Sequence, residues 1–400
     1  MLANFTAAGD MSVSVPETDT AQNASDGSPN QDEASPSLQS DDAGLAHPRA
    51  GQLRRLATGN SAHFYGGTSL FNIFVSDKEI QSTPRTDWST STAVPGSAAD
   101  INNPGASPHD GVYQYAPHDD VSQRLMASFF REQYSYNMYV YREYFLRDYD
   151  IGTGRYYSDL LLFAICAMGS LVTGDPADLQ LFQVFSTQAQ QLLYPSLDRP
   201  DLTSLQALLI LGQCEIGRGC ASKGWLFCGM AFRLAHEMGL HLDPNNWSGT
   251  SEPDVDREIL RRVYWAAFII DKQLSLYFGR PPALYLYESD VRNTVRLPYP
   301  PDWEGLLDTY IAPGMSISAF EDGIALVGAL IHQAELSKIQ HKIITELFEN
   351  RRSQAHNATT AATVQKLHVS LTKWLASLPG KLYWNQWTVG KIPACVLHLQ

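Results

Sequence analysis

Two histidines and a glutamate lie close together near the end of an apolar stretch. They are His236, Glu237 and His241, in the segment Ala235-His-Glu-Met-Gly-Leu-His-Leu-Asp243. Zinc proteases carry His-Glu-x-x-His on one helix, where histidines four positions apart are separated by about 40° around the axis and face one metal ion. Here the spacing is five positions, which separates the side chains by roughly 140°. Gly239 also predicts a left-handed helix cap before His241. We therefore expect no shared metal ion.

A second group of polar residues lies in a later apolar stretch. Asp271 and Ser275 are four positions apart, so they share one face of a helix. A carboxylate buried there needs a partner. The candidate partners are Arg233, Arg261, Arg262 and Arg280. Two interpretations stay open: His236, Asp271, Ser275 and Arg280 form a pocket for a small polar effector, or they belong to an ion-pair network that fixes the helix end. We favour the second.

Motifs that carry catalysis or nucleotide binding are missing from the sequence. It contains no G-x-S-x-G nucleophile elbow, no G-x-G-x-x-G after a strand and no G-x-x-x-x-G-K-[ST] loop. We therefore predict that the protein is not an enzyme and list no catalytic or metal-binding residue. The alternative is a helical enzyme of an unrecognised type that uses His236, Glu237, Asp271 or His241.

The composition excludes several classes of protein. Of the 400 residues 44% are hydrophobic, so a sizeable core can form, and the formal net charge is −13. An acidic chain has no overall basic footprint for nucleic acid or for an anionic membrane. The start lacks the features of a secretory signal, and no apolar run is long enough to span a bilayer. The five cysteines are odd in number and include no C-x-x-C pair, which favours reduced thiols in an intracellular protein.

The first 118 residues form the first predicted region. Residues 1–50 contain eight acidic residues and one basic residue, with a single aromatic, Phe5. Such a segment cannot bury enough apolar surface to offset the entropy of ordering, so we expect disorder. Aromatic residues return in 60–75, which we expect to dock on a neighbouring domain as an extended piece. Residues 81–118 are again rich in Ser, Thr, Pro and Gly, and we expect them to form a linker.

Residues 119–400 form the second predicted region, and its hydrophobic residues recur at helical spacing. Strand-type alternation is nearly absent. The expected helices span about 121–149, 155–174, 177–195, 201–217, 221–239, 251–279, 316–351 and 359–378, with an irregular Pro-rich stretch at 281–314. Asp201 or Thr203 is the expected start of the helix that ends at Gly217 or Gly219, and Gly279 is the expected end of the helix over 251–279. Short connections between long helices predict an all-α array of packed antiparallel helices.

Several of these stretches together resemble the fungal-specific transcription factor domain, the helical regulatory region of fungal zinc-cluster regulators. The resemblance is most specific in residues 224–282, where an apolar helix ends in a G-L-H-x-D segment and a second helix leads to G-R-P. The positions that carry it are Trp225, Arg233, Gly239, His241, Asp243, Arg261, Trp265, Gly279 and Pro281. His63–Phe71 resembles a further segment of the family.

Two features depart from the family pattern. The family reads DNA with six cysteines around two zinc ions, yet no cysteine precedes Cys166. We therefore expect no cofactor and no DNA-binding residue in this chain, with zinc only by family association. The chain also stops in an apolar run at Gln400, so we expect the domain to be incomplete at its C-terminus. A truncated fragment without function is the remaining alternative.

The resemblance implies a regulator of transcription in the nucleus. Its expected partners are proteins of the transcription machinery or a DNA-binding regulator, with a small-molecule effector as a further candidate. It implies no membrane partner. Direct nucleic-acid binding is not expected of this chain alone. The sequence leaves open the target genes, the sign of regulation and the oligomeric state.

Two tryptophans of the resemblance are expected in the core. If both are buried, Trp225→Ala and Trp265→Ala each lower the free energy of unfolding by roughly 3–5 kcal/mol, because a large cavity replaces an aromatic side chain. The midpoint of urea unfolding measures this. An unchanged midpoint would place that tryptophan on the surface.

Overall fold

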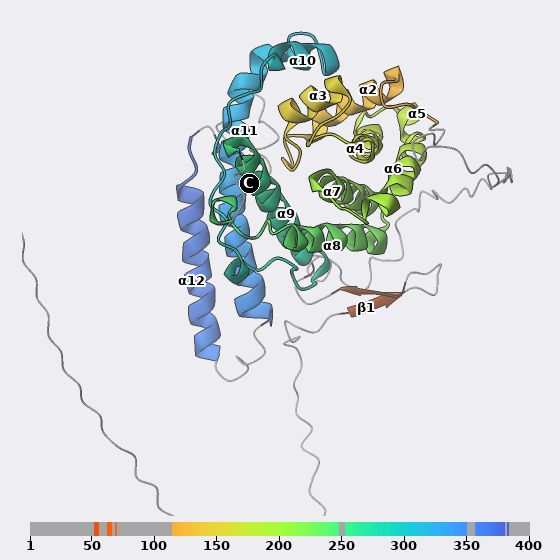
Figure 1. Cartoon of the computed structure of the whole chain (residues 1–400). Helices are drawn as coiled ribbons and strands as arrows, with labels where there is room; N and C mark the ends of the chain where they lie inside the picture. Colours follow the sequence, from red (N-terminus) through yellow and green to blue (C-terminus); the bar gives the residue numbers. More distant parts are fainter. Residues whose placement is uncertain are drawn as a thin grey trace, which may run out of the picture. The chain divides into compact units, whose positions relative to one another are not determined.

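The computed structural model describes residues 52–55, 62–65, 69, 114–247, 253–349, 357–380 and 382–383. The predictions for the acidic tail 1–50, for most of the linker and for the C-terminal end lie outside the described residues. Within the described part nearly all regular structure is helical, so the predicted all-α fold class is confirmed (Figure 1).

The helix α4 (Asp159–Val172) forms the centre of the core. Ser158 caps its N-terminus by accepting a hydrogen bond from the Leu161 N–H at 3.2 Å. Every residue from 160 to 170 is buried, as expected of a helix that is apolar on all sides. It packs against α2 (Asp120–Ser128), α6 (Phe182–Ser196) and α7 (Leu202–Gly217). Figure 1 shows α4 end-on, with these helices around it.

The backbones of α7 and α8 (Ala221–Glu237) approach each other closely at two glycines. A Cβ atom on Gly224 would lie 2.5 Å from the carbonyl oxygen of Gly212, and one on Gly212 would lie 2.4 Å from Sγ of Cys228. Both positions therefore need glycine for a steric reason. The predicted start of α7 is confirmed, because Asp201 and Ser204 form a capping box.

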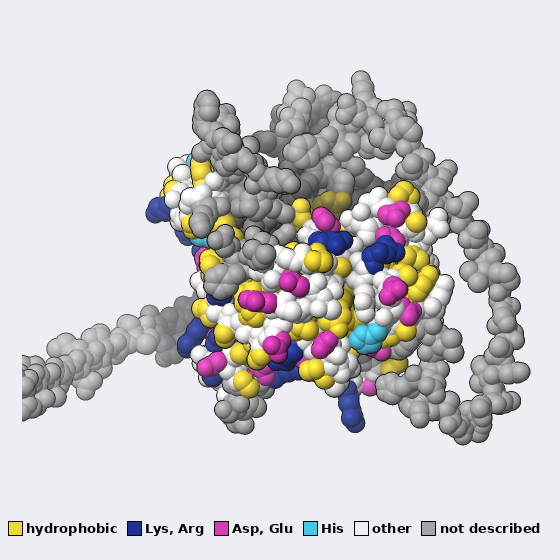
Figure 2. Space-filling model, turned by 90° about the horizontal axis from the view of Figure 1, so that it is seen from above, with side chains coloured by type: hydrophobic (Ala, Val, Ile, Leu, Met, Phe, Trp, Pro, Cys, Tyr) yellow, Lys and Arg dark blue, Asp and Glu magenta, His cyan; other side chains and the backbone are white. Residues whose placement is uncertain are grey.

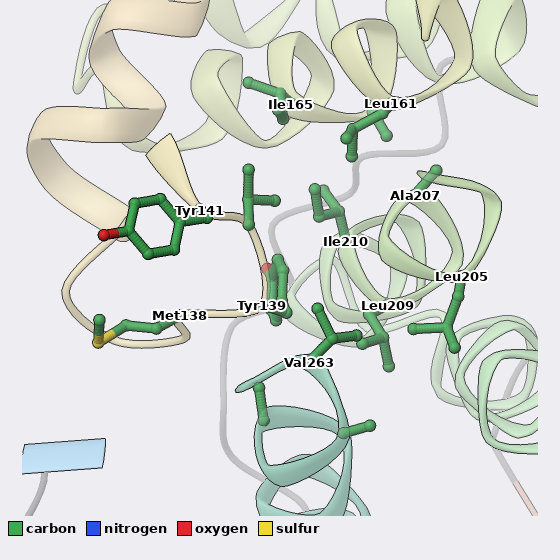
Figure 3. Close-up of a cluster of buried hydrophobic side chains, with 14 of the residues drawn as sticks. Met138, Tyr139, Tyr141, Leu161, Ile165, Leu205, Ala207, Leu209, Ile210 and Val263 are labelled. Carbon is green, nitrogen blue, oxygen red and sulfur yellow. The ribbon is translucent and has the colours of Figure 1, made fainter. Parts of the chain in front are cut away.

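The helix expected over 121–149 is interrupted, which corrects the sequence-based prediction. The helix α2 continues into the π-helix η1 (Phe129–Gln133), an irregular segment follows, and α3 (Arg142–Ile151) begins only after it. Tyr139 explains the break: its hydroxyl donates to Oε1 of Gln213 at 2.8 Å and its carbonyl accepts from Nε2 of Gln206. Figure 3 shows this segment against the aliphatic side chains of α7 and α9. The hydrogen bonds of this segment with α7 therefore stabilise the break, although the sequence has the periodicity of a continuous helix.

The second half of the described chain is built on α9 (Asp254–Phe278), which ends at Gly279 with φ 66°, as predicted. It packs on α11 (Met315–Lys342), which continues into the π-helix η4 (Ile343–Glu349). The helix α12 (Asn357–Ala376) runs beside α11 in Figure 1. The stretch expected to be irregular contains one α-helix, α10 (Trp303–Tyr310). The short elements are α5 (Pro176–Leu179), η2 (Pro244–Asn246) and η3 (Leu286–Glu288).

A two-stranded antiparallel hairpin lies within the region expected to be mostly disordered. It pairs β1 (Gln52–Arg55) with β2 (Ala62–Tyr65), and Gln52 lies opposite Tyr65. Its short strands gave no alternating pattern in the sequence. Farther along, the Ser69 hydroxyl is fully buried and donates to the Tyr277 carbonyl at 2.9 Å. Docking of the whole segment 60–75 stays a prediction, because its other residues after β2 lie outside the described part.

The cysteines of the described part are free. Cys166, Cys214 and Cys228 are buried and Cys220 is exposed. Burial raises the pKa of the first three thiols, so they stay protonated. No helix of the described residues combines the length and the apolar character that crossing a bilayer requires.

The glycine contact gives a test of the packing between α7 and α8. We expect Gly224→Ala to lower the free energy of unfolding by about 1–3 kcal/mol, because the added methyl group meets backbone that cannot move aside. Urea unfolding followed by circular dichroism measures the change. Gly229→Ala on the same helix is the matched control, since a Cβ there meets open space and should leave stability unchanged or slightly higher. Equal effects of the two variants would contradict this packing.

Candidate functional site

The end of α8 forms the turn that positions Asp243. Gly239 adopts φ 69°, its N–H bonds to the carbonyl of His236 at 3.0 Å, and the Leu240 N–H bonds to the carbonyl of Ala235 at 2.9 Å. These two bonds make a Schellman cap, and the buried Leu240 provides its hydrophobic contact. The predicted capped helix end is therefore confirmed. The chain then turns toward α9.

The carboxylate of Asp243 is fully buried and joins three segments. Arg261 on α9 donates from Nε and Nη2 to its two oxygens, both at 2.9 Å. The backbone N–H groups of Arg292 and Asn245 donate at 2.9 and 3.0 Å. Burial alone would raise the pKa of Asp243, but these donors outweigh it and lower the pKa to about 2. The carboxylate is therefore charged at neutral pH and ties the α8–α9 connection and the loop after α9 to one arginine.

Two further side chains of α9 hold the same loop. The buried carboxylate of Glu258 accepts hydrogen bonds from the Thr294 hydroxyl and from the Val295 N–H, the latter at 2.7 Å. Trp265 is 2% exposed, and its indole N–H donates to the carbonyl of Arg292 at 2.7 Å. The loop is irregular, so its backbone polar groups need partners from outside it. The helix α9 supplies them.

The C-terminal half of α9 repeats this arrangement with Asp271 and Lys272. Both side chains are fully buried and form an ion pair. The carboxylate of Asp271 accepts hydrogen bonds from the N–H groups of Ala283 and Leu284, both at 2.9 Å. Lys272 also donates to the carbonyl of Leu284. Burial lowers the pKa of Lys272, and the charge of Asp271 opposes that shift. The pair fixes the turn that follows Gly279.

Comparison with known proteins identifies the family. The model of the fungal specific transcription factor domain matches residues 126–376, which is more than half of the chain. The chain belongs to this family. The matched region contains α9 and all the segments that its carboxylates and arginines hold.

Three relatives show the range of similarity. An uncharacterised transcriptional regulatory protein of Schizosaccharomyces pombe is 43% identical over 284 residues, covering 70% of this chain and 45% of the relative. The activatory protein CHA4 of Saccharomyces cerevisiae is 30% identical, covering 66% and 42%. The nitrogen assimilation transcription factor nit-4 of Neurospora crassa is 26% identical, covering 95% and 35%. The chain thus spans less than half the length of these relatives. No solved structure matches.

Asp271 lies in a buried ion pair that binds the turn after α9, in line with the ion-pair interpretation favoured from the sequence, but its partner is not one of the predicted arginines. The partner of Asp271 is the adjacent Lys272, not Arg280. The Arg280 guanidinium lies over the rings of Trp225 and Phe278, with centroid distances of 4.8 and 4.6 Å. Ser275 is buried, and its hydroxyl forms no hydrogen bond within the described part. Sequence reasoning missed Lys272, although a lysine within an apolar run signals a buried pair.

The remaining family positions divide between interior and surface. Trp265 is in the core, as expected, whereas Trp225 is only partly buried and packs against Phe278, so the larger loss of stability is expected at Trp265. Arg233 and Glu237 are exposed on α8, and Pro281 is exposed after Gly279. The structure gives Arg233 no part in the network.

The two histidines come closer than their spacing suggested. The rings of His236 and His241 lie 5.1 Å apart, because the cap at Gly239 turns the chain back over the last turn of α8. His236 Nε2 lies 3.3 Å from Oε2 of Glu288. Within the described ranges, no group of three or more His, Cys, Asp or Glu residues is arranged to hold a metal ion. The absence of a cofactor from the chain stays a prediction.

Asp243 provides a test with a defined pH dependence. We expect Asp243→Asn to lower the free energy of unfolding at pH 7 by about 2–4 kcal/mol, because the partly buried Arg261 loses the charged partner that accepts two of its hydrogen bonds. The folded pKa of about 2 lies below the unfolded value of about 3.9, so the stabilisation is nearly complete above about pH 5 and is lost progressively as the pH falls to about 2 and below. The difference between variant and wild type should shrink over that range in urea unfolding curves.

The control for this variant is Asp254→Asn, which removes the carboxylate of an exposed pair with Arg257 and should change stability by less than about 0.5 kcal/mol. A difference at Asp243 that stays constant from pH 7 to pH 2 would contradict the role of its charge.

Proposed function

We propose that this chain is the regulatory part of a transcription regulator that works in the nucleus through protein partners. The match of the fungal transcription factor domain over residues 126–376 carries the proposal. The names of the relatives support it: one is an activatory protein and one a nitrogen assimilation transcription factor. Those names describe the relatives.

The contact with a partner is assigned to the loop that α9 holds. The carboxylates of Asp243, Glu258 and Asp271 accept hydrogen bonds from backbone N–H groups of this loop, at residues 283–284, 292 and 295. Two hydrophobic side chains of the same loop point outward, because Tyr287 is 80% exposed and Val295 is 58% exposed. A loop positioned by a rigid scaffold is a common place for recognition residues. The polar network therefore serves to present a fixed apolar surface.

The contact with DNA is assigned to a separate module. The chain carries a net charge of −13, which opposes binding to a polyanion. On the face drawn in Figure 2, acidic side chains are scattered among hydrophobic ones, and the Lys and Arg side chains described there form no continuous patch. Tight, zinc-dependent binding of this chain alone to DNA in a gel-shift assay would contradict this assignment.

A reporter assay tests the proposal. The full chain is fused to an unrelated DNA-binding domain whose operator controls a reporter gene in a fungal cell. We expect reporter output to differ from that of the DNA-binding domain alone, in either direction. Tyr287→Ala should reduce this difference without changing the unfolding midpoint, because its side chain is exposed.

The matched control is Tyr194→Ala on α6, whose side chain is also 80% exposed. Output equal to that of the DNA-binding domain alone, from a fusion protein that accumulates normally, would overturn the regulatory role. Equal effects of the two tyrosine variants would overturn the assignment of the partner surface to the loop.

A further inference from the structure

An open groove lies where the C-terminal ends of three helices, α7, α9 and α11, come together. It leaves about 520 Å³ for the centres of water-sized molecules, which is within the range of small-molecule sites. Its wall includes Gln213, Ile216 and Gly217 of α7, Leu274 and Tyr277 of α9, and Gln340 of α11. A molecule bound in this groove would therefore touch helices from both halves of the described chain.

The wall of the groove is mainly apolar and carries no formal charge. Ile216, Leu274 and Leu276 supply aliphatic surface, and Tyr277, which is 37% exposed, supplies an aromatic side chain. None of the described lining residues is Asp, Glu, Lys, Arg or His. A charged ligand would lose hydration here without gaining a counter-ion, which is costly. The groove therefore suits an uncharged molecule.

Gln213 gives this wall a hydrogen-bond donor with a fixed orientation. The hydroxyl of the fully buried Tyr139 donates to Oε1 of Gln213 at 2.8 Å. Burial raises the pKa of Tyr139 well above its ordinary value, so the hydroxyl keeps its proton and remains the donor. Because this bond engages the amide oxygen, the NH₂ group of Gln213 is left to donate. No hydrogen bond joins that NH₂ group to another residue of the described part.

Gly217 and Gln340 contribute space and further polar capacity. A Cβ atom on Gly217 would meet no atom within 4 Å, so the groove is open up to the backbone of α7. On the α11 side, Oε1 of Gln340 is buried and has no hydrogen-bond partner among the described residues. The folded chain thus leaves amide groups unused around an apolar space, as is typical of sites that orient a ligand by a few polar contacts.

We propose that this groove binds an uncharged, mainly apolar small molecule that carries a carbonyl oxygen. The NH₂ group of Gln213 donates to that oxygen, and Tyr139 acts as a positioning residue that holds the amide in the donating orientation. The aliphatic side chains of α7 and α9 contact the apolar body of the molecule. Use of the molecule as a regulatory signal rests on the proposed function, whereas its binding does not.

Equilibrium dialysis of the full chain against four naphthalene probes tests the site. The probes share one ring system: 2-acetylnaphthalene carries a carbonyl, 2-ethylnaphthalene carries none, 2-naphthoate is negative and 2-naphthylmethylammonium is positive. We expect saturable binding of 2-acetylnaphthalene and at least about tenfold weaker binding of either ion. Equal or tighter binding of either ion overturns the uncharged class, and no saturable binding of 2-acetylnaphthalene overturns the site.

A variant of Gln213 tests the hydrogen bond. Gln213→Glu keeps an oxygen that accepts from Tyr139 but replaces the NH₂ donor with a second oxygen. It should weaken binding of 2-acetylnaphthalene at least about fivefold and leave that of 2-ethylnaphthalene unchanged, because only the acetyl group uses the donor. An equal effect on the two probes overturns the role of Gln213.

A variant of Gly217 tests the location. Gly217→Leu fills the groove and should weaken binding of both neutral probes at least about tenfold. Gly229→Leu on α8 is the matched control, because a Cβ there also meets open space and the residue does not line the groove. Unchanged binding in Gly217→Leu overturns the location. If Gln213→Glu does not fold, Gly217→Leu decides the site.

The chain's own residues 70–75 are the alternative occupant, because Ser69 donates to the carbonyl of Tyr277, a residue that lines the groove. These residues lie outside the described part, and their sequence is Leu-Phe-Asn-Ile-Phe-Val. We expect Phe71→Asp to leave the affinity for 2-acetylnaphthalene unchanged. Tighter binding in Phe71→Asp would show that the segment competes for the groove and would overturn the assignment to a small molecule.

The reporter assay separates this proposal from the regulatory one. Lost probe binding in Gly217→Leu, together with unchanged reporter output in cells, supports the site and overturns its regulatory use. A reporter fusion without any output overturns the regulatory role but leaves the dialysis result standing.

Discussion

The described part of the domain depends on buried carboxylates that bind backbone N–H groups of an irregular loop. Asp243, Glu258 and Asp271 each accept at least one such bond, and each is offset by a cation of α9. A buried ion pair by itself adds little net stability, because desolvation of both charges opposes the attraction between them. Its role here is geometric, because the bonds fix how a mostly irregular loop lies on the helix.

This constraint explains why polar residues recur within the apolar stripe of α9. Asp271 lies about 100° from Lys272 around the axis, whereas Glu258, Arg261, Trp265 and Lys272 lie within about 60° of one another on one side of the helix. That side carries the loop. Arg262 lies one position away from Arg261, is rotated by about 100° around the axis and lies over the ring of Tyr141. One helix thus serves two environments through neighbouring arginines.

Much of the fold could be predicted from the sequence, because it depends on interactions between residues that are close together in the chain. The caps at Asp201, Gly239 and Gly279 and the apolar helix α4 depend on residues close to each other in the chain. The break before α3 could not be predicted, since it results from side chains of α7 that lie about 70 positions away. The partner of Asp271 is a different case, because Lys272 is adjacent in the chain and its place within an apolar run is a local signal that favours it over the four arginines.

The Schellman cap at Gly239 connects the end of α8 to the segment that α9 holds. It joins α8 to the segment whose Asp243 is held by α9, and α8 in turn touches α7 backbone to backbone at two glycines. Both contacts are close. The contact between α7 and α8 is between main chains, and the contact between Asp243 and Arg261 is a bidentate ion pair. A rotation of α9 by even one residue would move Arg261 through about 100°. We therefore expect a displacement of α9 to shift the α8–α9 connection with it.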